Sequence, residues 1–152
     1  MSMNDKKIIQ KIVLGGVVIN NGKVLLLQRN KDEDVYPNMW ELPSGKKEAL
    51  EPSEESLTRE IKEESGLEVD IIIPLSVFDY QIEKTDEIRD STQINFIVKP
   101  KNNLDVKISR EHQNFVWVSE SEIDNYNLTE SVKSALKKVF FLAPLLKDAG
   151  LL

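Results

Sequence analysis

Three glutamates stand close enough together in the sequence to form a divalent metal site. They are Glu60, Glu63 and Glu64, spaced at i, i+3 and i+4. On a helix, this spacing brings the three side chains onto one surface. Carboxylates gathered on a rigid element repel one another unless a cation neutralises them, and oxygen ligands favour a hard ion such as Mg²⁺ or Mn²⁺. The alternative is a solvated acidic helix face, in a chain that has 26 Asp and Glu residues.

The segment that carries these glutamates is predicted to be a helix over residues 53–65. Ser53 is suited to cap its start, and Gly66 is suited to end it. With 3.6 residues per turn, the three glutamates share one arc that borders the apolar stripe of Leu57 and Ile61. We therefore expect the first and third glutamates to be partly sheltered by the protein.

The wider spacing matches a known motif. From Gly45 the sequence continues with five residues, Glu51, seven residues, Arg-Glu, an aliphatic residue, any residue, Glu-Glu, any residue, a glycine and an aliphatic residue. This pattern is the Nudix box, and the chain matches it without an interruption. The stretch 40–45 before the box and the later strand with Trp117 are also similar to the family. The chain therefore resembles a Nudix hydrolase of the MutT-like branch over most of its length.

The resemblance implies a fold, a reaction and a cofactor. The fold would be α/β, a Nudix-type α/β/α sandwich with a central mixed sheet. The reaction would be hydrolysis of a nucleoside diphosphate linked to another group, with Mg²⁺ or Mn²⁺ as the cofactor. One of the glutamates would act as general base, and the resemblance leaves open which one. The residues implied as metal ligands are Gly45 through the backbone, Glu60, Glu63, Glu64 and Glu111.

The same resemblance implies roles for the neighbouring residues. Arg59 would serve catalysis through a glutamate rather than on the substrate. Glu51 would either bind metal or pin its loop to the helix, and we prefer the second, structural role, which Gly66 would share. Arg29 resembles a phosphate-contacting arginine, with a solvated arginine at a strand end as the alternative. For Glu111, the alternative is an ordinary acid of a surface loop.

Residue types that are absent from the sequence narrow the range of expected substrates. Residues 81–99 contain no proline or tyrosine of the kind that marks other branches of the family, and the chain has no cysteine for thiol-dependent isomerases of this fold. A nucleoside triphosphate, cleaved to monophosphate and pyrophosphate, is favoured. Cleansing of oxidised guanine nucleotides is a narrower option, but Thr129 stands where MutT carries its purine-reading Asn. The alternatives are a non-catalytic nucleotide sensor, a hydrolase of another substrate such as a sugar nucleotide, and a purely structural acidic domain.

Composition sets further bounds. The 152 residues suit a single domain, with residues 1–10 as an N-terminal extension and 143–152 as a C-terminal tail. A net charge of −6 and the lack of a long basic tract argue against binding a nucleic acid polymer. No signal peptide or membrane-spanning apolar run is evident. We expect a cytoplasmic protein whose partner is a small-molecule nucleotide, with no membrane partner and with a homodimer left open.

The remaining elements follow from periodicity and turn residues. Pro74 predicts a bulge or an edge, residues 81–90 read as a charged connection, and Pro144 is expected to stop a second helix over 129–141. The predicted strands cover residues 11–20, 24–27, 39–42, 67–80, 92–98 and 114–118.

Several other side chains are ambiguous in the sequence. Phe78, Tyr80 and Phe96 are interpreted either as rings that stack on a base or as core residues, and the core is preferred because strand aromatics are usually buried. His112 is the single histidine of the chain. Its place next to Glu111 would suit proton transfer, but we treat it as an incidental loop residue.

Overall fold

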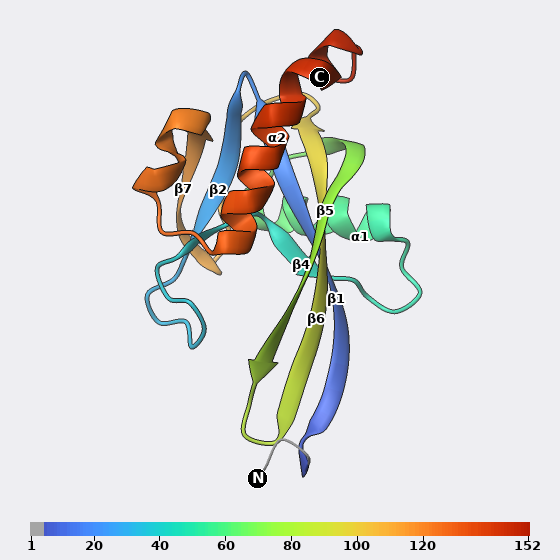
Figure 1. Ribbon diagram of the computed structural model, residues 1–152, viewed down its shortest axis with the longest axis vertical. Helices are drawn as coiled ribbons and strands as arrows, with labels where there is room; N and C mark the ends of the chain where they lie inside the picture. The colour runs from blue at the N-terminus through green and yellow to red at the C-terminus, as the bar shows by residue number, and fades with distance from the viewer. Residues whose placement is uncertain (1–4) are drawn as a thin grey trace.

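The computed structural model describes residues 5–152, and it shows one long, curved sheet with a helix on each side (Figure 1). In chain order the elements are β1 (Lys7–Asn20), β2 (Lys23–Arg29), β3 (Trp40–Glu41), β4 (Ser44–Lys46), α1 (Ser53–Ser65), β5 (Val69–Glu83), β6 (Glu87–Pro100), β7 (His112–Ser119), the 3₁₀ helix η2 (Glu120–Asn125) and α2 (Glu130–Asp148). The strand order is β3-β2-β1-β6-β5, with β4 paired to β1 and β7 paired to β2. β1 runs parallel to β6 and antiparallel to β2 and β4. The predicted α/β/α sandwich with a mixed sheet is confirmed.

The two faces of β1 serve two different cores. Leu14 packs in a cluster with Ile61 of α1, whereas Val17 packs in a second cluster with Leu136 of α2. This alternation is what a strand buried on both faces requires. Gly16 lies where a side chain would collide with Ile61. The glycine therefore lets α1 approach the sheet closely, and this approach sets the position of the glutamates that α1 carries.

Helix α1 has the predicted length, but it begins differently from the prediction. Pro52 is the N-cap residue, and no side chain caps the helix. Ser53 is already the first helical residue, so its predicted capping role is wrong. The backbone N–H of Ser56 donates to the carbonyl of Pro52 at 3.0 Å and starts the helix instead. At the other end Gly66 adopts φ 76°, and its N–H donates to the Lys62 carbonyl, which confirms the predicted glycine stop.

The hairpin of β5 and β6 extends much further than the sequence predicts. Residues 81–90 form most of its far end rather than a charged connection, because β5 continues to Glu83 and β6 begins at Glu87. β1 likewise begins at Lys7 and pairs with this end of β6, so residues 7–10 are strand and not an extension. Charged side chains can alternate with apolar ones here because backbone pairing decides the structure. The predicted irregularity at Pro74 is confirmed by register shifts on both sides of it.

The C-terminal segment is helical where a tail was predicted. Pro144 lies inside α2, which continues to Asp148. A proline costs a helix one backbone hydrogen bond and some steric strain, but Leu146 beyond it is buried in the α2 core. This burial favours continuation of the helix past the proline. Among residues 5–152, none of the helices combines the length and the apolar character that crossing a membrane requires.

Replacement of the proline should stabilise the protein. In Pro144→Ala the N–H at position 144 can restore the helical bond, and the side chain at this position is exposed. We expect the free energy of unfolding to rise by about 1–3 kcal/mol, measured by denaturant titration. Lys138→Ala, on the exposed side of the same helix, is the control and should change little. A less stable Pro144→Ala protein would contradict the interpretation.

Candidate active site

Glu64 is the buried member of the glutamate cluster. Only 6% of the residue is exposed, and the backbone N–H of Ser44 in β4 donates to its Oε2 at 3.0 Å. Burial, together with the nearby carboxylates of Glu41, Glu111 and Glu60, raises the pKa of Glu64 to about 9 against the opposing effect of the Ser44 hydrogen bond. In the absence of a cation this carboxyl group therefore holds a proton at neutral pH.

Glu60 lies one helical turn away, against the backbone of β4. A side chain at position 45 would overlap the carboxyl group of Glu60, so Gly45 leaves room for that group beside the backbone of β4. Burial raises the pKa of Glu60, and the carboxylates of Glu63 and Glu111 add to the shift, while Arg59 opposes it. The two sheltered glutamates of α1 thus share one electrostatic environment, as the helical arc predicted.

Arg59 ties the loop before α1 to the glutamates. Its Nε and Nη2 donate to the two carboxylate oxygens of Glu51 at 3.1 and 3.0 Å, which lowers the pKa of Glu51 and raises the pKa of Arg59. Its Nη1 reaches Glu60 at 3.0 Å and Glu63 at 3.3 Å. This geometry supports the pinning role preferred for Glu51 and a role for Arg59 that acts through the glutamates. The side chain of Glu63 is the most open of the group, with 58% exposed.

The chain returns to this cluster at the start of β7. Candidate ligand atoms of Glu64, Glu111 and His112 all lie within 4.8 Å of one another. Glu111 is exposed and stands near enough to raise the pKa values of both Glu60 and Glu64. The structure therefore brings Glu111 to the glutamates of α1, and it adds the histidine that we treated as incidental.

His112 is a buried residue and not an open loop histidine. Its side chain is 2% exposed, and Nε2 lies 2.9 Å from Oε1 of Glu41. Within residues 5–152, its Nδ1 is buried with no hydrogen-bond partner. The sequence analysis missed Glu41 altogether, and the one signal for His112 was its position beside Glu111. A ring nitrogen held by a carboxylate is an arrangement that fixes the orientation of an imidazole near a metal.

Arg29 lies in the same network, at the end of β2. Its Nη1 is 3.3 Å from both carboxylate oxygens of Glu41, and its Nε donates to the carbonyl of Val35 at 3.0 Å. Glu33 is a weaker partner at 3.5 Å. The arginine is thus paired within the protein and lines the pocket described next, so it holds Glu41 against His112.

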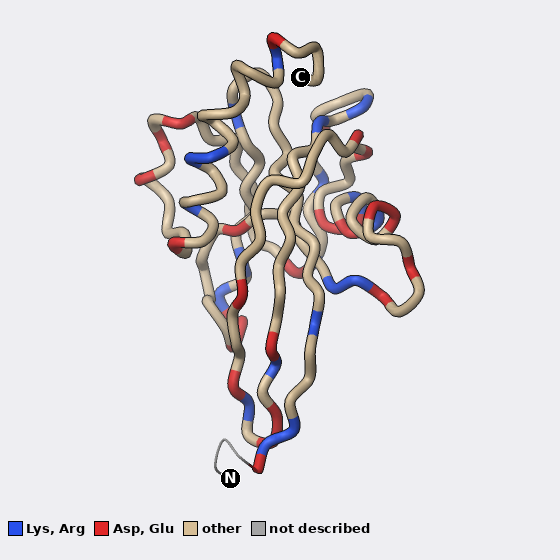
Figure 2. The backbone as a smooth tube through the Cα atoms, turned by 45° about the vertical axis from the view of Figure 1, so that its right-hand side comes forward, with Lys and Arg blue, Asp and Glu red and all other residues tan. Residues whose placement is uncertain are grey.

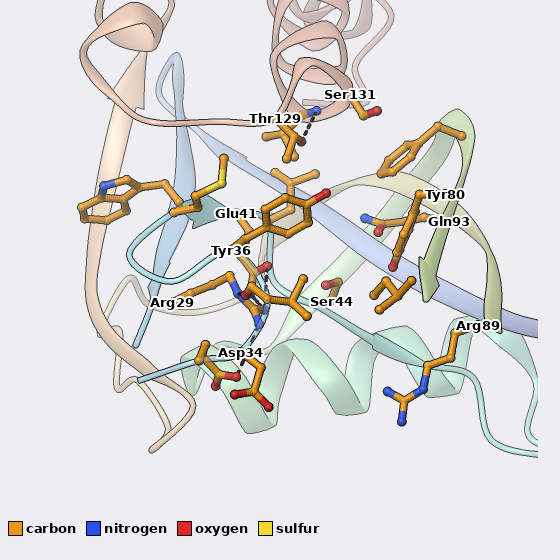
Figure 3. Close-up of a pocket in the computed structure, with 18 of the residues that line it drawn as sticks. Arg29, Asp34, Tyr36, Glu41, Ser44, Tyr80, Arg89, Gln93, Thr129 and Ser131 are labelled. Atoms are coloured by element: carbon orange, nitrogen blue, oxygen red, sulfur yellow. Dashed lines mark hydrogen bonds and ion pairs between the residues drawn. The ribbon is translucent and has the colours of Figure 1, made fainter. Parts of the chain in front are cut away.

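A pocket of about 370 Å³ adjoins the acidic cluster (Figure 3). Glu41 and Ser44 line it at the side of the glutamates, and α2 closes another side with Thr129 and Ser131. The predicted ambiguity among the aromatics is resolved by position. Phe78 and Tyr80 line the pocket, with ring centroids 5.7 Å apart, whereas Phe96 belongs to the core beneath α1. The aromatic lining residues are Tyr36, Trp40, Phe78 and Tyr80.

The donors of the cluster suit a divalent cation. Acidic residues lie along α1 in Figure 2 together with basic ones. The basic residues of the helix are paired with other acids, since Arg59 is taken up by Glu51, Glu60 and Glu63 and Lys62 by Glu68. Carboxylates that raise one another's pKa values in a half-buried place bind a cation in exchange for protons. The arrangement can hold a metal beside a pocket that is open to a small molecule.

Known proteins that are similar to this chain in sequence or in fold are consistent with the geometry of the site. The profile of the NUDIX domain matches residues 11–140. The nucleoside triphosphatase NudI of Enterobacter sp. (strain 638) is 32% identical over 130 residues, which cover 82% of this chain and 92% of the relative. NudI of Klebsiella pneumoniae (strain 342) is 30% identical, with 85% and 96% covered. The crystal structure of a MutT NUDIX hydrolase from Burkholderia pseudomallei has a TM-score of 0.73 at 23% identity, with 86% and 98% covered.

A mixed sheet between two helices, with a row of glutamates on one helix that is linked through Ser44 to a pocket, is the arrangement of a hydrolase of the Nudix fold. The chain belongs to the NUDIX domain family, and it is a Nudix hydrolase. This confirms the family that the motif from Gly45 to Leu67 indicated.

The protonation of Glu64 should appear in the stability of the metal-free protein. Its pKa rises from 4.5 to about 9 on folding, so between these values the unfolded chain has lost a proton that the folded chain still holds. The free energy of unfolding should therefore fall as pH rises, by at most about 1.4 kcal/mol per pH unit. We expect denaturant titrations in EDTA between pH values of about 5 and 9 to show this fall in the wild type and a weaker one in Glu64→Gln.

Glu55→Gln is the matched control for that measurement. Glu55 lies on the exposed side of the same helix, and its replacement should leave the wild-type slope. If Glu64→Gln kept the full slope, the burial of Glu64 would not be the cause.

Proposed function

We propose that the protein hydrolyses a nucleoside triphosphate to a monophosphate and pyrophosphate, with Mg²⁺ or Mn²⁺ as its cofactor. The relatives that are about 30% identical are named nucleoside triphosphatases, which supports this substrate class for the chain. The cytoplasmic location and the homodimer stay predictions from the sequence.

One observation carries the proposal. The buried carboxyl group of Glu64 lies beside Glu111 and His112, and its partner Ser44 also lines the aromatic pocket. The acidic cluster and the pocket therefore meet at Ser44, and the pocket volume of about 370 Å³ lies within the range of small-molecule sites. This arrangement suits a substrate that joins an aromatic base to a chain of phosphates.

The residues present fit a hard divalent ion. Glu60, Glu63, Glu64 and Glu111, with the backbone at Gly45, would hold it, because carboxylate and carbonyl oxygens are the ligands that such ions prefer. When bound, the metal would neutralise phosphate charge and make a coordinated water more acidic.

The chain's own groups would carry out the remaining steps. A carboxylate of the cluster accepts a proton from the water that attacks phosphorus, and the bond from that phosphorus to the leaving pyrophosphate oxygen breaks. Arg59 holds Glu60 and Glu63 in place and is itself held by Glu51. Arg29 forms an ion pair with Glu41 and would act through that residue. Arg59 therefore positions acidic groups, whereas the phosphate contact of Arg29, which also lines the pocket, stays a prediction.

The pocket is relevant to the narrower option of oxidised guanine nucleotides. Thr129, which replaces the purine-reading Asn of MutT, is among the pocket residues and also caps α2, where its hydroxyl accepts from the N–H of Val132. The base preference therefore depends on other side chains of the pocket. A panel of canonical, oxidised and methylated nucleoside triphosphates, sugar nucleotides and dinucleotides, with product analysis, would identify the substrate.

The central prediction is that Glu64→Gln lowers kcat at least about 100-fold while the protein stays folded. The amide keeps the volume of the side chain and can no longer bind a cation or accept the proton. Release of pyrophosphate under Mg²⁺ measures the effect, circular dichroism checks the fold, and Glu55→Gln serves as the control.

Two outcomes would count against the proposal. Unchanged turnover in Glu64→Gln would show that the cluster is not the catalytic site. Tight binding of one nucleotide by the wild type, with no turnover of any member of the panel, would favour a sensor.

A further inference from the structure

A chain of buried amide and hydroxyl groups crosses the sheet on the face toward the pocket. Asn95 of β6 is fully buried and Gln93 is 8% exposed. Nε2 of Gln93 donates to Oδ1 of Asn95 at 2.9 Å, and Nδ2 of Asn95 donates to the hydroxyl of Ser76 in β5 at 3.2 Å. Buried polar side chains are costly in a core, and a position of this kind on a sheet normally carries an apolar residue. Packing alone therefore does not explain this row of hydrogen-bonded polar side chains.

The neighbouring strand makes room for these groups. Gly15 of β1 lies opposite Asn95, and a side chain there would overlap the Asn95 amide and stand 2.9 Å from Nε2 of Gln93. A glycine inside a strand is less favourable than an alanine because it loses more backbone freedom on folding. The glycine thus leaves room for the amides of Asn95 and Gln93 at a place where burial of polar groups is itself costly.

Gln93 ends this chain of polar groups at the pocket. It lines the cavity, and in Figure 3 its amide lies beside Tyr80 and points toward the middle of the pocket. An amide offers one carbonyl oxygen and two N–H groups, and the bond to Asn95 uses one N–H. Among residues 5–152, the structure pairs neither the carbonyl oxygen nor the second N–H with a protein group. Gln93 therefore presents an acceptor and a donor side by side.

The aromatic residues stand in register with this amide. Phe78 of β5 pairs with Gln93 across the two strands, and Tyr80 is its neighbour on the same face. A flat ring that packs against these side chains would bring its edge to the Gln93 amide. Bases carry adjacent donors and acceptors on their edges, and an amide side chain recognises such a pair in a bidentate manner.

We propose that Gln93 reads the hydrogen-bonding edge of the substrate's base, and that Asn95, Ser76 and Gly15 hold its amide in the orientation that this reading requires. The inference rests on the proposed hydrolysis of a nucleoside triphosphate and names a residue that determines base specificity at that site. Gln93 contacts the base, whereas Asn95 and Ser76 are positioning residues.

The test is a cycle of two proteins and two substrates. Wild type and Gln93→Ala are compared on the nucleoside triphosphate that the wild type cleaves best and on ribose 5′-triphosphate, which has no base. We expect Gln93→Ala to lower kcat/KM by about 10-fold or more for the nucleotide, mainly through KM, and to change it by less than about 2-fold for ribose triphosphate. The affinity for the monophosphate product, measured by calorimetry, should fall in parallel.

Matched variants separate the loss of a contact with the base from a change in the protein structure. Gln81→Ala removes an amide from an exposed position of β5 and should behave as the wild type. Ser76→Ala removes the anchor of Asn95 and should raise KM for the nucleotide by a smaller factor with kcat unchanged, and Ser76→Thr, which keeps the hydroxyl, should restore it. Thermal melts confirm that each variant is folded.

The outcomes distinguish this inference from the proposed function. If Gln93→Ala lowered kcat/KM equally for both substrates, or for neither, the base-reading role would be overturned. The proposed hydrolysis would still stand, because it is tested by the activity of the wild type. If the wild type hydrolysed no nucleoside triphosphate, the proposed function and this inference would fall together.

Discussion

The burial of one carboxyl group, that of Glu64, is the constraint on which the rest of the site depends. A carboxylate in this place is unstable without a compensating charge, and within residues 5–152 the hydrogen bond to it comes from the backbone N–H of Ser44. Three separate elements converge to create this condition. Helix α1 carries the glutamate, β4 supplies the N–H, and the start of β7 adds Glu111 and His112. The same electrostatic cost makes the cluster suited to a cation, which would replace protons on these carboxyl groups.

The backbone must come unusually close to its neighbours at three places for this arrangement to exist. Gly16 admits Ile61 of α1, Gly45 admits the carboxyl group of Glu60, and Gly15 admits Asn95 on the pocket side. In each case the absent side chain leaves room for the side chain of a neighbouring element. The first two glycines set the distance of the glutamates from the sheet. The third gives the opposite face of β1 room for polar groups, so a single strand supports both the acidic cluster and the pocket.

The acidic cluster and the pocket are connected at the point where β1 changes its pairing partner from β2 to β4. β1 pairs with β2 only at Ile19 and Asn20 in the register of the two strands, and β4 takes the place beside β1 at Val13–Gly15. The short segment from β3 to β4 crosses this point. Its residues Glu41 and Ser44 face the pocket and also contact His112 and Glu64. A substrate in the pocket would therefore lie next to the acids although α1 and α2 cover opposite faces.

The sequence by itself determined the features that depend on neighbours along the chain. The helix over 53–65, its stop at Gly66, the shared arc of Glu60 and Glu64 and the irregularity at Pro74 follow from local periodicity and backbone preference, and the motif identified the family. Tertiary structure alone decided the rest. Four features depend on groups that come together from distant parts of the polypeptide. They are the long β5–β6 hairpin, the continuation of α2 through Pro144, the contact of His112 with Glu41 and the hydrogen bonds that link the side chains of Ser76, Asn95 and Gln93. Their energies come from pairing and burial, which no local pattern records.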